Sequence, residues 1–413
     1  MKLQECKLGD LIDVTRGASL AGEFYATEGN LIRLTCGNFD YNNNCFKENT
    51  SKDDIYFSGN VKPEFILEKG DIITPLTEQA IGLLGSTAII PESGKYIQSQ
   101  DVAKVTCKNG KIDKNFAFYL ISSDTVKKQL SAGAQQTKIR HTSPDAIKGC
   151  KVFVPDLPNQ KRIGSLLRTL DDKIALNQRI NRNLEELARL IYDYWFVQFD
   201  FPDKNGKPYK TSGGKMVYND QLKREIPAGW DSGSLSDIAN ITMGQSPDGS
   251  SYNEEGNGVV FYQGSTDFGM RFPSVRQYTT APTRFAKKGD ILMSVRAPVG
   301  AVNIANEDCC VGRGLSAMNS KIGSITHLYY IIDYFRHTFE NKNSAGTTFG
   351  SITKDELFAL PVVIPSDFVL HKFEDIAKPI FDKQMELGKE TVELTQQRDR
   401  LLPLLMNGQV TIS

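Results

Sequence analysis

The chain repeats itself after more than 200 residues, and this constrains its fold more than any other feature of the sequence. Residues 8–19 return as residues 235–246, with leucine, aspartate, threonine, glycine and serine at matching places. Three shorter segments return in the same order, at 69–72 and 288–291, at 131–133 and 344–346, and at 152–155 and 362–365. Solenoid repeats have periods of about 20–50 residues, so this repeat indicates a duplicated domain.

Each copy has the texture of a mixed domain. Short β-branched runs such as 86–90 and 151–154 stand between clusters of Gly, Pro and Asn, which is typical of strands joined by turns. Segments 115–121 and 326–335 predict one short helix in each copy. We therefore expect an α+β fold with two similar globular domains.

A long helix is predicted after the first domain, over residues 159–195. On a heptad frame its a positions are Ile163, Leu170, Asn177, Leu184 and Ile191, and its d positions are Leu166, Lys173, Ile180, Leu187 and Tyr194. Eight of these ten residues are apolar or aromatic over five heptads, which favours a coiled coil over a lone amphipathic surface helix. Asn177 at an a position is typical of a residue that fixes helix register.

A second long helix follows the second domain. Its a positions are Phe373, Ile380, Leu387, Leu394 and Leu401, and its d positions are Ile376, Lys383, Glu390, Gln397 and Leu404. Pro379 lies inside this pattern and predicts that the helix starts there or kinks there. Each helix has one apolar seam and needs a partner, and the other helix of the same chain is the obvious one.

Two equal units on one chain tend to pair about a pseudo-two-fold axis, as subunits do in a symmetric dimer. If that axis is perpendicular to the helices, they pack as an antiparallel coiled coil; a parallel packing remains open. The predicted boundaries are 1–157 for the first domain, 158–198 for the first helix, 199–229 for a turn-rich connector, 230–367 for the second domain, 368–407 for the second helix and 408–413 for a tail.

The composition is that of an ordinary globular protein. Among the 413 residues no apolar run approaches the ~20 residues that a membrane span needs. The seven cysteines form no C-x-x-C pair, which favours reduced thiols and a cytoplasmic location. Four scattered histidines offer no spacing for a metal site. The formal net charge is zero, so any binding to nucleic acid must depend on local patches or on a partner that adds positive charge.

Common catalytic motifs are missing. The sequence contains no phosphate-binding loop, no H-E-x-x-H, no G-x-S-x-G, no dinucleotide-binding glycine motif after a strand, and no tetrapeptide of amino-group methyltransferases. A binding or scaffold role is therefore favoured over catalysis.

The repeat, the two heptad helices and the connector together resemble the specificity (S) subunit of type I restriction–modification systems. The most specific stretch is 190–202, continued by 213–216 and 222–230. Residues 160–163, which open the first helix, and residues 8–11 are also similar to that family. The resemblance covers essentially the whole chain.

This resemblance implies that each globular unit is a target-recognition domain for one half of a bipartite DNA site, and that the helices act as a ruler that sets the spacer. Two methyltransferase (modification) subunits, which use S-adenosylmethionine to methylate adenine N6, bind such a chain, and motor-endonuclease (restriction) subunits join for cleavage. The specificity subunit itself is non-catalytic and holds no cofactor. Because the two domains have diverged, the DNA target is expected to be asymmetric.

Base-recognising side chains are usually polar or cationic and lie on loops. The first candidates are Gln135, Gln136, Thr137, Lys138 and Arg140, with Thr347, Thr348 and Ser351 in the second copy. Further candidates are Gln79 with Arg296, Gln98 and Gln100 with Arg313, and finally Gln263 and Ser265. For each of them, a solvated loop or a fold-stabilising hydrogen bond is the alternative.

Exposed faces of the helices and the connector, including Trp195 and Phe199, are candidate methyltransferase contacts, although both aromatic residues suit burial within the chain equally well. Two other functions stay open at this point. One is an interaction scaffold with two ligand-binding modules on a coiled-coil spacer and no DNA role. The other is an enzyme with an unfamiliar site.

Overall fold

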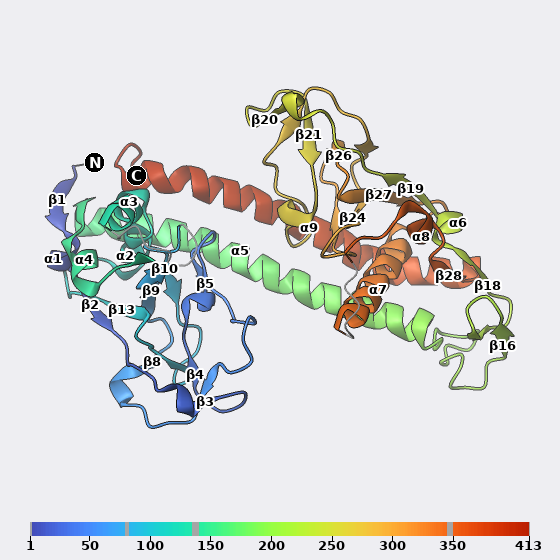
Figure 1. Cartoon of the computed structure of the whole chain (residues 1–413), viewed down its shortest axis with the longest axis horizontal. Coiled ribbons are helices and arrows are strands. Elements are labelled where there is room, and N and C mark those ends of the chain that lie inside the picture. Colours follow the sequence, from blue (N-terminus) through green and yellow to red (C-terminus); the bar gives the residue numbers. More distant parts are fainter. Residues whose placement is uncertain (1, 79–81, 134–139, 345–349, 413) are drawn as a thin grey trace. The chain divides into compact units, whose positions relative to one another are not determined.

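The computed structural model describes residues 2–78, 82–133, 140–344 and 350–412 (Figure 1). The chain divides into two compact units, Met1–Lys173 with Leu394–Ser413, and Ile174–Glu393. Two long helices, α5 (Leu157–Tyr192) and α9 (Asp367–Met406), each contribute residues to both units. Each unit therefore contains one globular domain and a stretch of both long helices.

The globular domain of the first unit is built on two sheets. One has the order β11-β9-β13-β2 and is antiparallel throughout, and the other has the order β3-β7-β4-β12-β8, in which β4 and β12 run parallel. The bounds are β1 Gln4–Lys7, β2 Ile12–Arg16, β3 Tyr25–Ala26, β4 Ile32–Arg33, β5 Phe39–Asp40, β6 Cys45–Phe46, β7 Tyr56–Phe57, β8 Ile66–Leu67, β9 Ile72–Pro75, β10 Thr77–Glu78, β11 Ala88–Ile89, β12 Tyr96–Ile97, β13 Val102–Cys107, β14 Arg140–His141 and β15 Lys151–Val154. Its helices are α1 Leu8–Leu11, α2 Lys114–Ile121, α3 Asp124–Gly133 and α4 Pro144–Gly149.

The second unit repeats this topology strand for strand. Its sheets have the orders β25-β24-β27-β19 and β20-β22-β21-β26-β23, and its one parallel pair, β21 with β26, falls at the place of β4 with β12. The bounds are β18 Asp231–Ser234, β19 Ala239–Met243, β20 Tyr252–Asn253, β21 Val259–Tyr262, β22 Tyr278–Thr279, β23 Phe285–Ala286, β24 Ile291–Ser294, β25 Val302–Ile304, β26 Cys309–Val311, β27 Leu315–Ser320 and β28 Pro361–Ile364, with helices α6 Leu235–Ile238, α7 Ile325–Ser344 and α8 Lys354–Phe358. The predicted duplicated α+β fold is confirmed.

The repeated sequence motifs close turns. Asp10 and Asp237 each accept a hydrogen bond from the backbone N–H three residues earlier, at 2.9 and 2.7 Å, and so cap the short helices α1 and α6. In the repeated Lys-Gly-Asp-Ile segments, Gly70 and Gly289 have φ of 90° and 91°, a conformation that favours glycine. The repeat therefore preserves the residues that turn the backbone.

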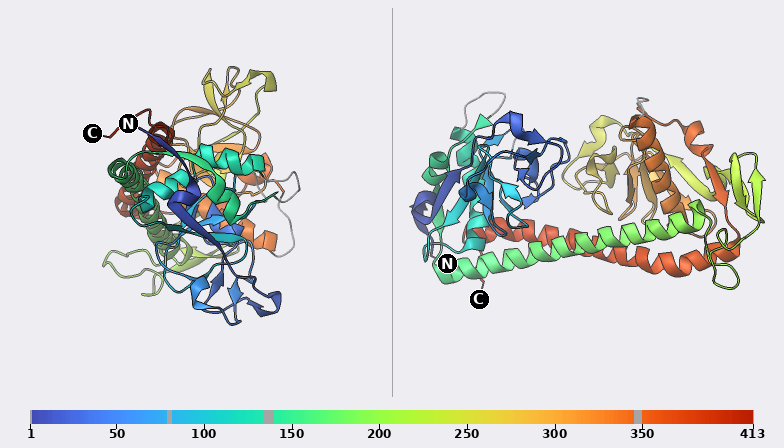
Figure 2. Two further views of the ribbon diagram at one scale, coloured as in Figure 1. Left: turned by 90° about the vertical axis from the view of Figure 1, so that its left-hand side faces the viewer. Right: turned by 90° about the horizontal axis from the view of Figure 1, so that it is seen from below.

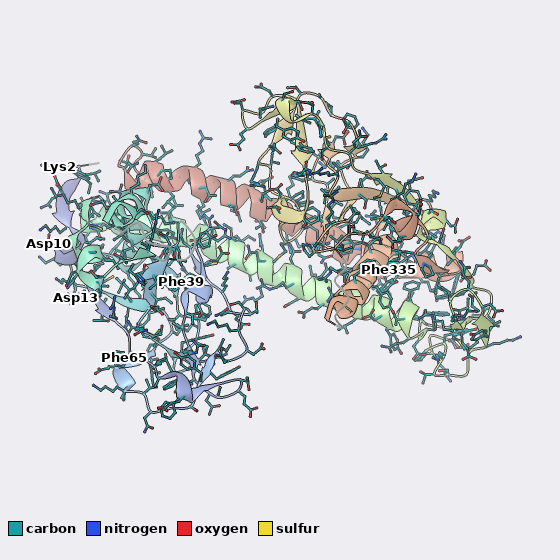
Figure 3. All side chains as sticks on the ribbon, in the orientation of Figure 1. Lys2, Asp10, Asp13, Phe39, Phe65 and Phe335 are labelled. Carbon is teal, nitrogen blue, oxygen red and sulfur yellow. The ribbon has the colours of Figure 1, made fainter. Side chains whose placement is uncertain are left out.

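The two long helices pair antiparallel within each unit. In the first unit, Asp171 of α5 binds Arg398 of α9 at 3.1 Å. In the second unit, Asn177 donates to Glu390 and Gln384 donates to Glu185, both at 2.7 Å. Residue numbers rise along α5 as their partners fall along α9, which excludes the parallel alternative (Figure 2).

The burial pattern corrects the predicted seam. Among the predicted a positions, Ile163, Asn177, Phe373 and Leu387 are buried, while Leu170, Leu184, Ile191, Ile380, Leu394 and Leu401 are half-buried. The second line of buried side chains lies four residues after nine of these ten positions, the exception being Leu387. Its members are Leu167, Ile174, Asn181 and Ala188 of α5, Trp195 in the turn after α5, and Ala377, Gln384, Arg398 and Leu405 of α9. The predicted d positions were wrong, since Lys173, Leu187, Tyr194 and Ile376 are exposed.

Helix α9 runs through Pro379 from Asp367 to Met406, so the expected start at this proline is wrong. Helix α5 passes at Tyr192 into a π-helical turn, Asp193–Val197, and the connector then forms a hairpin of β16 (Met216–Asn219) and β17 (Arg224–Pro227). No helix in the described ranges is long and apolar enough to cross a membrane. All seven cysteines lie in the structure as free thiols.

Candidate nucleic-acid interface

Several of the predicted DNA-contacting residues lie outside the described residues. These are Gln79, Gln135, Gln136, Thr137, Lys138, Thr347 and Thr348. The residues that flank them in the sequence are described.

In the first unit, strands β10 and β14 pair and bring two of the predicted loops together. Thr77 lies opposite His141 and Glu78 lies opposite Arg140. The Arg140 guanidinium lies 3.6 Å from the Glu78 carboxylate, and Arg140 is about one-third exposed whereas Glu78 is buried. The site therefore places a partly exposed cation two residues after the candidate Lys138 in the sequence.

Glu78 belongs to the candidate segment 77–79, but no structural role was predicted for it. Its Oε1 accepts hydrogen bonds from the backbone N–H groups of Gly82, Leu83 and Leu84, at 2.8, 3.0 and 3.2 Å. A buried carboxylate needs such donors to offset the loss of water. Glu78 therefore holds the backbone of residues 82–84 and contacts Arg140 on the paired strand.

The second unit brings the equivalent segments together with different side chains. Arg296 and Ser351 form an antiparallel bridge, supported by a backbone hydrogen bond of 3.0 Å from Ile352 to Val295. Both bridged residues are exposed, and the strand pair is shorter than β10 with β14. Two predicted DNA-contacting residues therefore lie side by side on the surface here.

Gln98 does not fit a DNA-contacting role. Its side chain is 1% exposed, and its Nε2 donates to the backbone carbonyls of Thr15 and Val102 at 2.7 and 3.1 Å. The prediction for this residue is wrong, because the amide serves the protein backbone. Gln100, two residues further on, is exposed.

The second unit also holds a small polar cluster around Ser246. The Ser246 hydroxyl accepts from Gln263 Nε2 at 2.8 Å and from the backbone N–H of Arg313 at 3.2 Å. Gln263 and Ser265 are half-buried, whereas the Arg313 side chain is exposed. The turn that exposes the Arg313 side chain is thus held by hydrogen bonds to Ser246, and Gln263 contributes to this hydrogen-bonded cluster.

Trp195 and Phe199 are 5% and 3% exposed, so neither offers a contact to a partner. Both belong to an aromatic cluster in the second unit, where the Phe196 ring lies 4.5 Å from His327 and 5.0 Å from Phe373. Burial lowers the pKa of His327 to about 3, so its imidazole is neutral. This cluster is core and not an interface.

Helix α5 does present apolar side chains to solvent. Leu176, Leu187, Leu190 and Tyr194 are 39%, 46%, 66% and 39% exposed. The spacing of Leu176, Leu187 and Leu190 places them on one face of α5, and Tyr194 lies just beyond α5 in the π-helical turn Asp193–Val197. We call these four residues the α5 stripe. Exposed apolar patches of this kind mark protein–protein contacts.

Metal chemistry has no support in the described part of the chain, where no group of three or more His, Cys, Asp or Glu residues could hold an ion. Each unit joins two polar segments at its surface, Thr77 and Glu78 with His141 and Arg140 in the first unit and Arg296 with Ser351 in the second. We call each joined pair of segments a platform. The two platforms carry different side chains, which suits recognition of two different ligands of one kind.

Residues 2–186 and 227–401 match the family described as Type I restriction modification DNA specificity domain. The MjaX specificity subunit of a type I restriction enzyme from Methanocaldococcus jannaschii is 31% identical over 345 residues, which cover 80% of this chain and 76% of that protein. The MjaIX specificity subunit from the same organism is 25% identical over 366 residues, which cover 84% and 79%.

A solved structure shares the fold. The type I restriction–modification S subunit from M. genitalium superposes with a TM-score of 0.61 at 16% sequence identity, over 98% of this chain and 96% of that one. The family match falls twice, once on each globular domain together with most of the long helix that follows it.

Proposed function

Because the chain belongs to the type I restriction–modification DNA specificity family, we propose that each globular domain recognises one half of a bipartite, asymmetric DNA target. One observation carries this proposal. The same pair of segments meets in both units, yet the first presents Arg140 beside Glu78 and the second presents Arg296 beside Ser351. A shared platform with different polar groups suits two different half-sites, because side-chain donors and acceptors distinguish base edges.

The test is adenine methylation in a host that expresses the cognate methyltransferase subunit, with and without this chain. We expect a split, asymmetric motif that is methylated only when the chain is present. If both proteins fold and associate but no chain-dependent motif appears, the proposal fails and the scaffold function is favoured.

The catalytic step belongs to the partner in this proposal. The chain acts without a cofactor of its own, and the methyltransferase subunits bind S-adenosylmethionine and transfer the methyl group to adenine. Restriction subunits join the complex for cleavage. Turnover of S-adenosylmethionine by the isolated chain would contradict this division of labour.

We propose the α5 stripe as the docking surface for a methyltransferase subunit. Leu190 is the most exposed of its four residues, and its contact with a partner would remove apolar surface from water. Leu190→Glu should abolish co-purification of the methyltransferase, whereas Val217→Glu should not, although Val217 is 47% exposed. Equal losses for the two variants would remove the stripe from the interface.

The helices set the spacer between the half-sites in this proposal. Seven residues inserted after Lys173 in α5 and seven before Leu394 in α9 would fall at the division between the two units and preserve each heptad. The insertion adds roughly 10 Å of helix, or about three base pairs. Methylation mapping of this variant should show a longer spacer between unchanged half-sites, and an unchanged spacer would exclude a ruler.

A further inference from the structure

A charged pocket of about 360 Å³ lies within the second unit, on the side of helix α5 that faces the globular domain. Residues of α5, of the loop 268–271, of the segment 298–303 and of α7 line it. The family match assigns no role to this pocket, and none of the DNA-contacting candidates lies in its wall.

Cations outnumber anions in the wall, which carries four arginines and two carboxylates. The Asp333 carboxylate accepts from Arg189 and Arg336, at 2.9 and 2.8 Å. The Glu185 carboxylate accepts from Arg271 at 2.6 Å and from Gln384 of α9 at 2.7 Å. Both carboxylates are therefore already bound to protein donors.

Arg182 is the remaining cation of the wall. Its side chain is exposed, and within the described residues no hydrogen bond or ion pair engages it. Because Arg182 and Glu185 are three residues apart on α5, they lie on the same face of the helix. The guanidinium of Arg182 is thus available to a ligand at the edge of a group of fixed charges.

Arg271 provides a second, independent sign that a ligand belongs here. Its side chain is 3% exposed, with the guanidinium 4.9 Å from the centre of the Tyr329 ring and 5.5 Å from that of Phe381. One of its terminal nitrogens, Nη1, has no hydrogen-bond partner in the part of the chain that the structure describes. Asn181 is 4% exposed, and its amide oxygen likewise has no hydrogen-bond partner among the described residues. Buried polar atoms without a partner are rare and costly.

The remaining wall is apolar and includes Met270, Val299 and Val302. Water-excluding walls strengthen the attraction between a guanidinium and an anion. The planar donor fork of arginine matches the oxygens of a phosphate, whether it is a monoester or the diester of a DNA backbone. Inorganic phosphate or a monoester that keeps one proton can in addition donate to the Asn181 amide oxygen, which a DNA phosphodiester cannot do.

We propose that this pocket binds a phosphate group through Arg182 and Arg271. Two sources share this chemistry, a free phosphate-bearing small molecule and a phosphate of the DNA backbone. Only the second source rests on the proposed DNA function.

The first experiment is titration of inorganic phosphate into the full chain, with binding measured by calorimetry and by thermal shift against sodium chloride of equal ionic strength. We expect saturable binding that Arg182→Gln weakens by roughly tenfold or more, since a charged bidentate contact is lost. Arg179→Gln is the matched control, because Arg179 is an exposed arginine of the same helix that does not line the pocket.

Three results would overturn the proposal. One is a phosphate effect no larger than that of chloride, and another is an equal loss in the Arg179 and Arg182 variants. The third is a phosphate affinity that is unchanged in the Arg182→Gln variant and also unchanged in the Arg271→Lys variant, provided that each variant keeps the melting temperature of the parent.

The source of the phosphate is decided by the salt dependence of DNA binding. If the DNA backbone occupies the pocket, Arg182→Gln should reduce the slope of log affinity against log salt by about 0.9 relative to Arg179→Gln. If a free phosphate compound occupies it, the slope should stay the same while phosphate binding is still lost. A complex of this chain with the methyltransferase subunit that binds phosphate but no DNA would refute the proposed function and leave the pocket proposal intact.

Discussion

Both units bring the same two segments together as a platform, but the pairing between the segments is longer in the first unit than in the second. In the first, β10 and β14 pair over two residues, and buried Glu78 binds three backbone N–H groups beside Arg140. In the second, a single bridge joins Arg296 to Ser351, and both residues are exposed. The shared topology holds the platform in place in both, whereas the side chains on it differ freely. A protein built in this way can change what one half recognises without rebuilding its fold.

The largest expected effect comes from removing the carboxylate of Glu78. Glu78→Ala leaves three backbone N–H groups without their acceptor and should destabilise the first unit by about 3 kcal/mol. Urea denaturation followed by hydrogen exchange should locate the loss in that unit. Ser351→Ala is the counterpart in the second unit and should change stability by less than about 0.5 kcal/mol, because Ser351 is exposed. Similar losses in both variants would contradict the difference drawn between the platforms.

Acid should open the second unit before the first. The pKa of buried His327 is lowered to about 3, so in the folded protein the ring stays neutral, while the unfolded chain takes up a proton below pH about 6.5. Stability is therefore full above pH 6.5 and falls as the pH drops toward 3, by at most about 3 kcal/mol at pH 4.

Both tryptophans of the chain, Trp195 and Trp230, lie in the His327 cluster and report this opening by fluorescence. His327→Gln should remove most of the pH dependence between 6.5 and 4. In the first unit His141 is exposed, and His141→Gln should leave the acid transition where it is. A transition that His141→Gln shifts as much as His327→Gln does would refute this assignment.

The polar contacts between helices α5 and α9 also differ between the two units. Arg398 is a buried cation bound to Asp171, which also accepts from the Tyr119 hydroxyl at 2.6 Å, whereas Asn177 is a neutral amide bound to Glu390. Arg398→Met should cost about 2 kcal/mol, because it leaves a partly buried carboxylate with less compensation. Asn177→Ala should cost about 1 kcal/mol. Chemical denaturation measures the loss of stability in each variant. A larger loss for Asn177→Ala than for Arg398→Met would contradict this prediction.

The sharpest effects on specificity are expected at two arginines, Arg140, which is about one-third exposed, and Arg296, which is exposed. Arg140→Ala and Arg296→Ala should each weaken target binding by about 1–2 kcal/mol, roughly tenfold, if each contacts a base or a phosphate. Binding assays on duplexes with one altered half-site should show that each variant loses discrimination at a different half. Loss at the same half in both variants would refute separate recognition by the two domains.

The repeat was enough to predict the duplicated α+β fold and the paired long helices, since motifs such as Lys-Gly-Asp-Ile and the helix-capping Asp10 recur where the backbone must turn. The pairing of Thr77 and Glu78 with His141 and Arg140 was not predicted, although Arg296 and Ser351 hold the matching places in the second unit.

The seam register escaped sequence analysis for a physical reason. Leu187 and Tyr194 continue an apolar pattern but face solvent, while Gln384 and Arg398 are polar and lie in the buried seam. A pattern of apolar residues cannot separate a face that packs inside the chain from one reserved for a partner. The prediction that Gln98 contacts DNA failed for a similar reason. Nothing in the sequence reveals that its side-chain amide donates to the backbone carbonyls of Thr15 and Val102.

The first unit is assembled from the two ends of the described chain. Leu405 and Met406 of α9 pack in the same core cluster as Ile163 and Leu167 of α5, and Arg162 donates to the carbonyl of Ile412 at 3.3 Å. During synthesis, about 220 residues separate the end of the first segment of this unit from the start of its second. At about 5–20 residues per second, the apolar face of α5 waits some 10–45 s for its partner. The ribosome therefore releases the second unit's residues while the first unit still lacks its second segment.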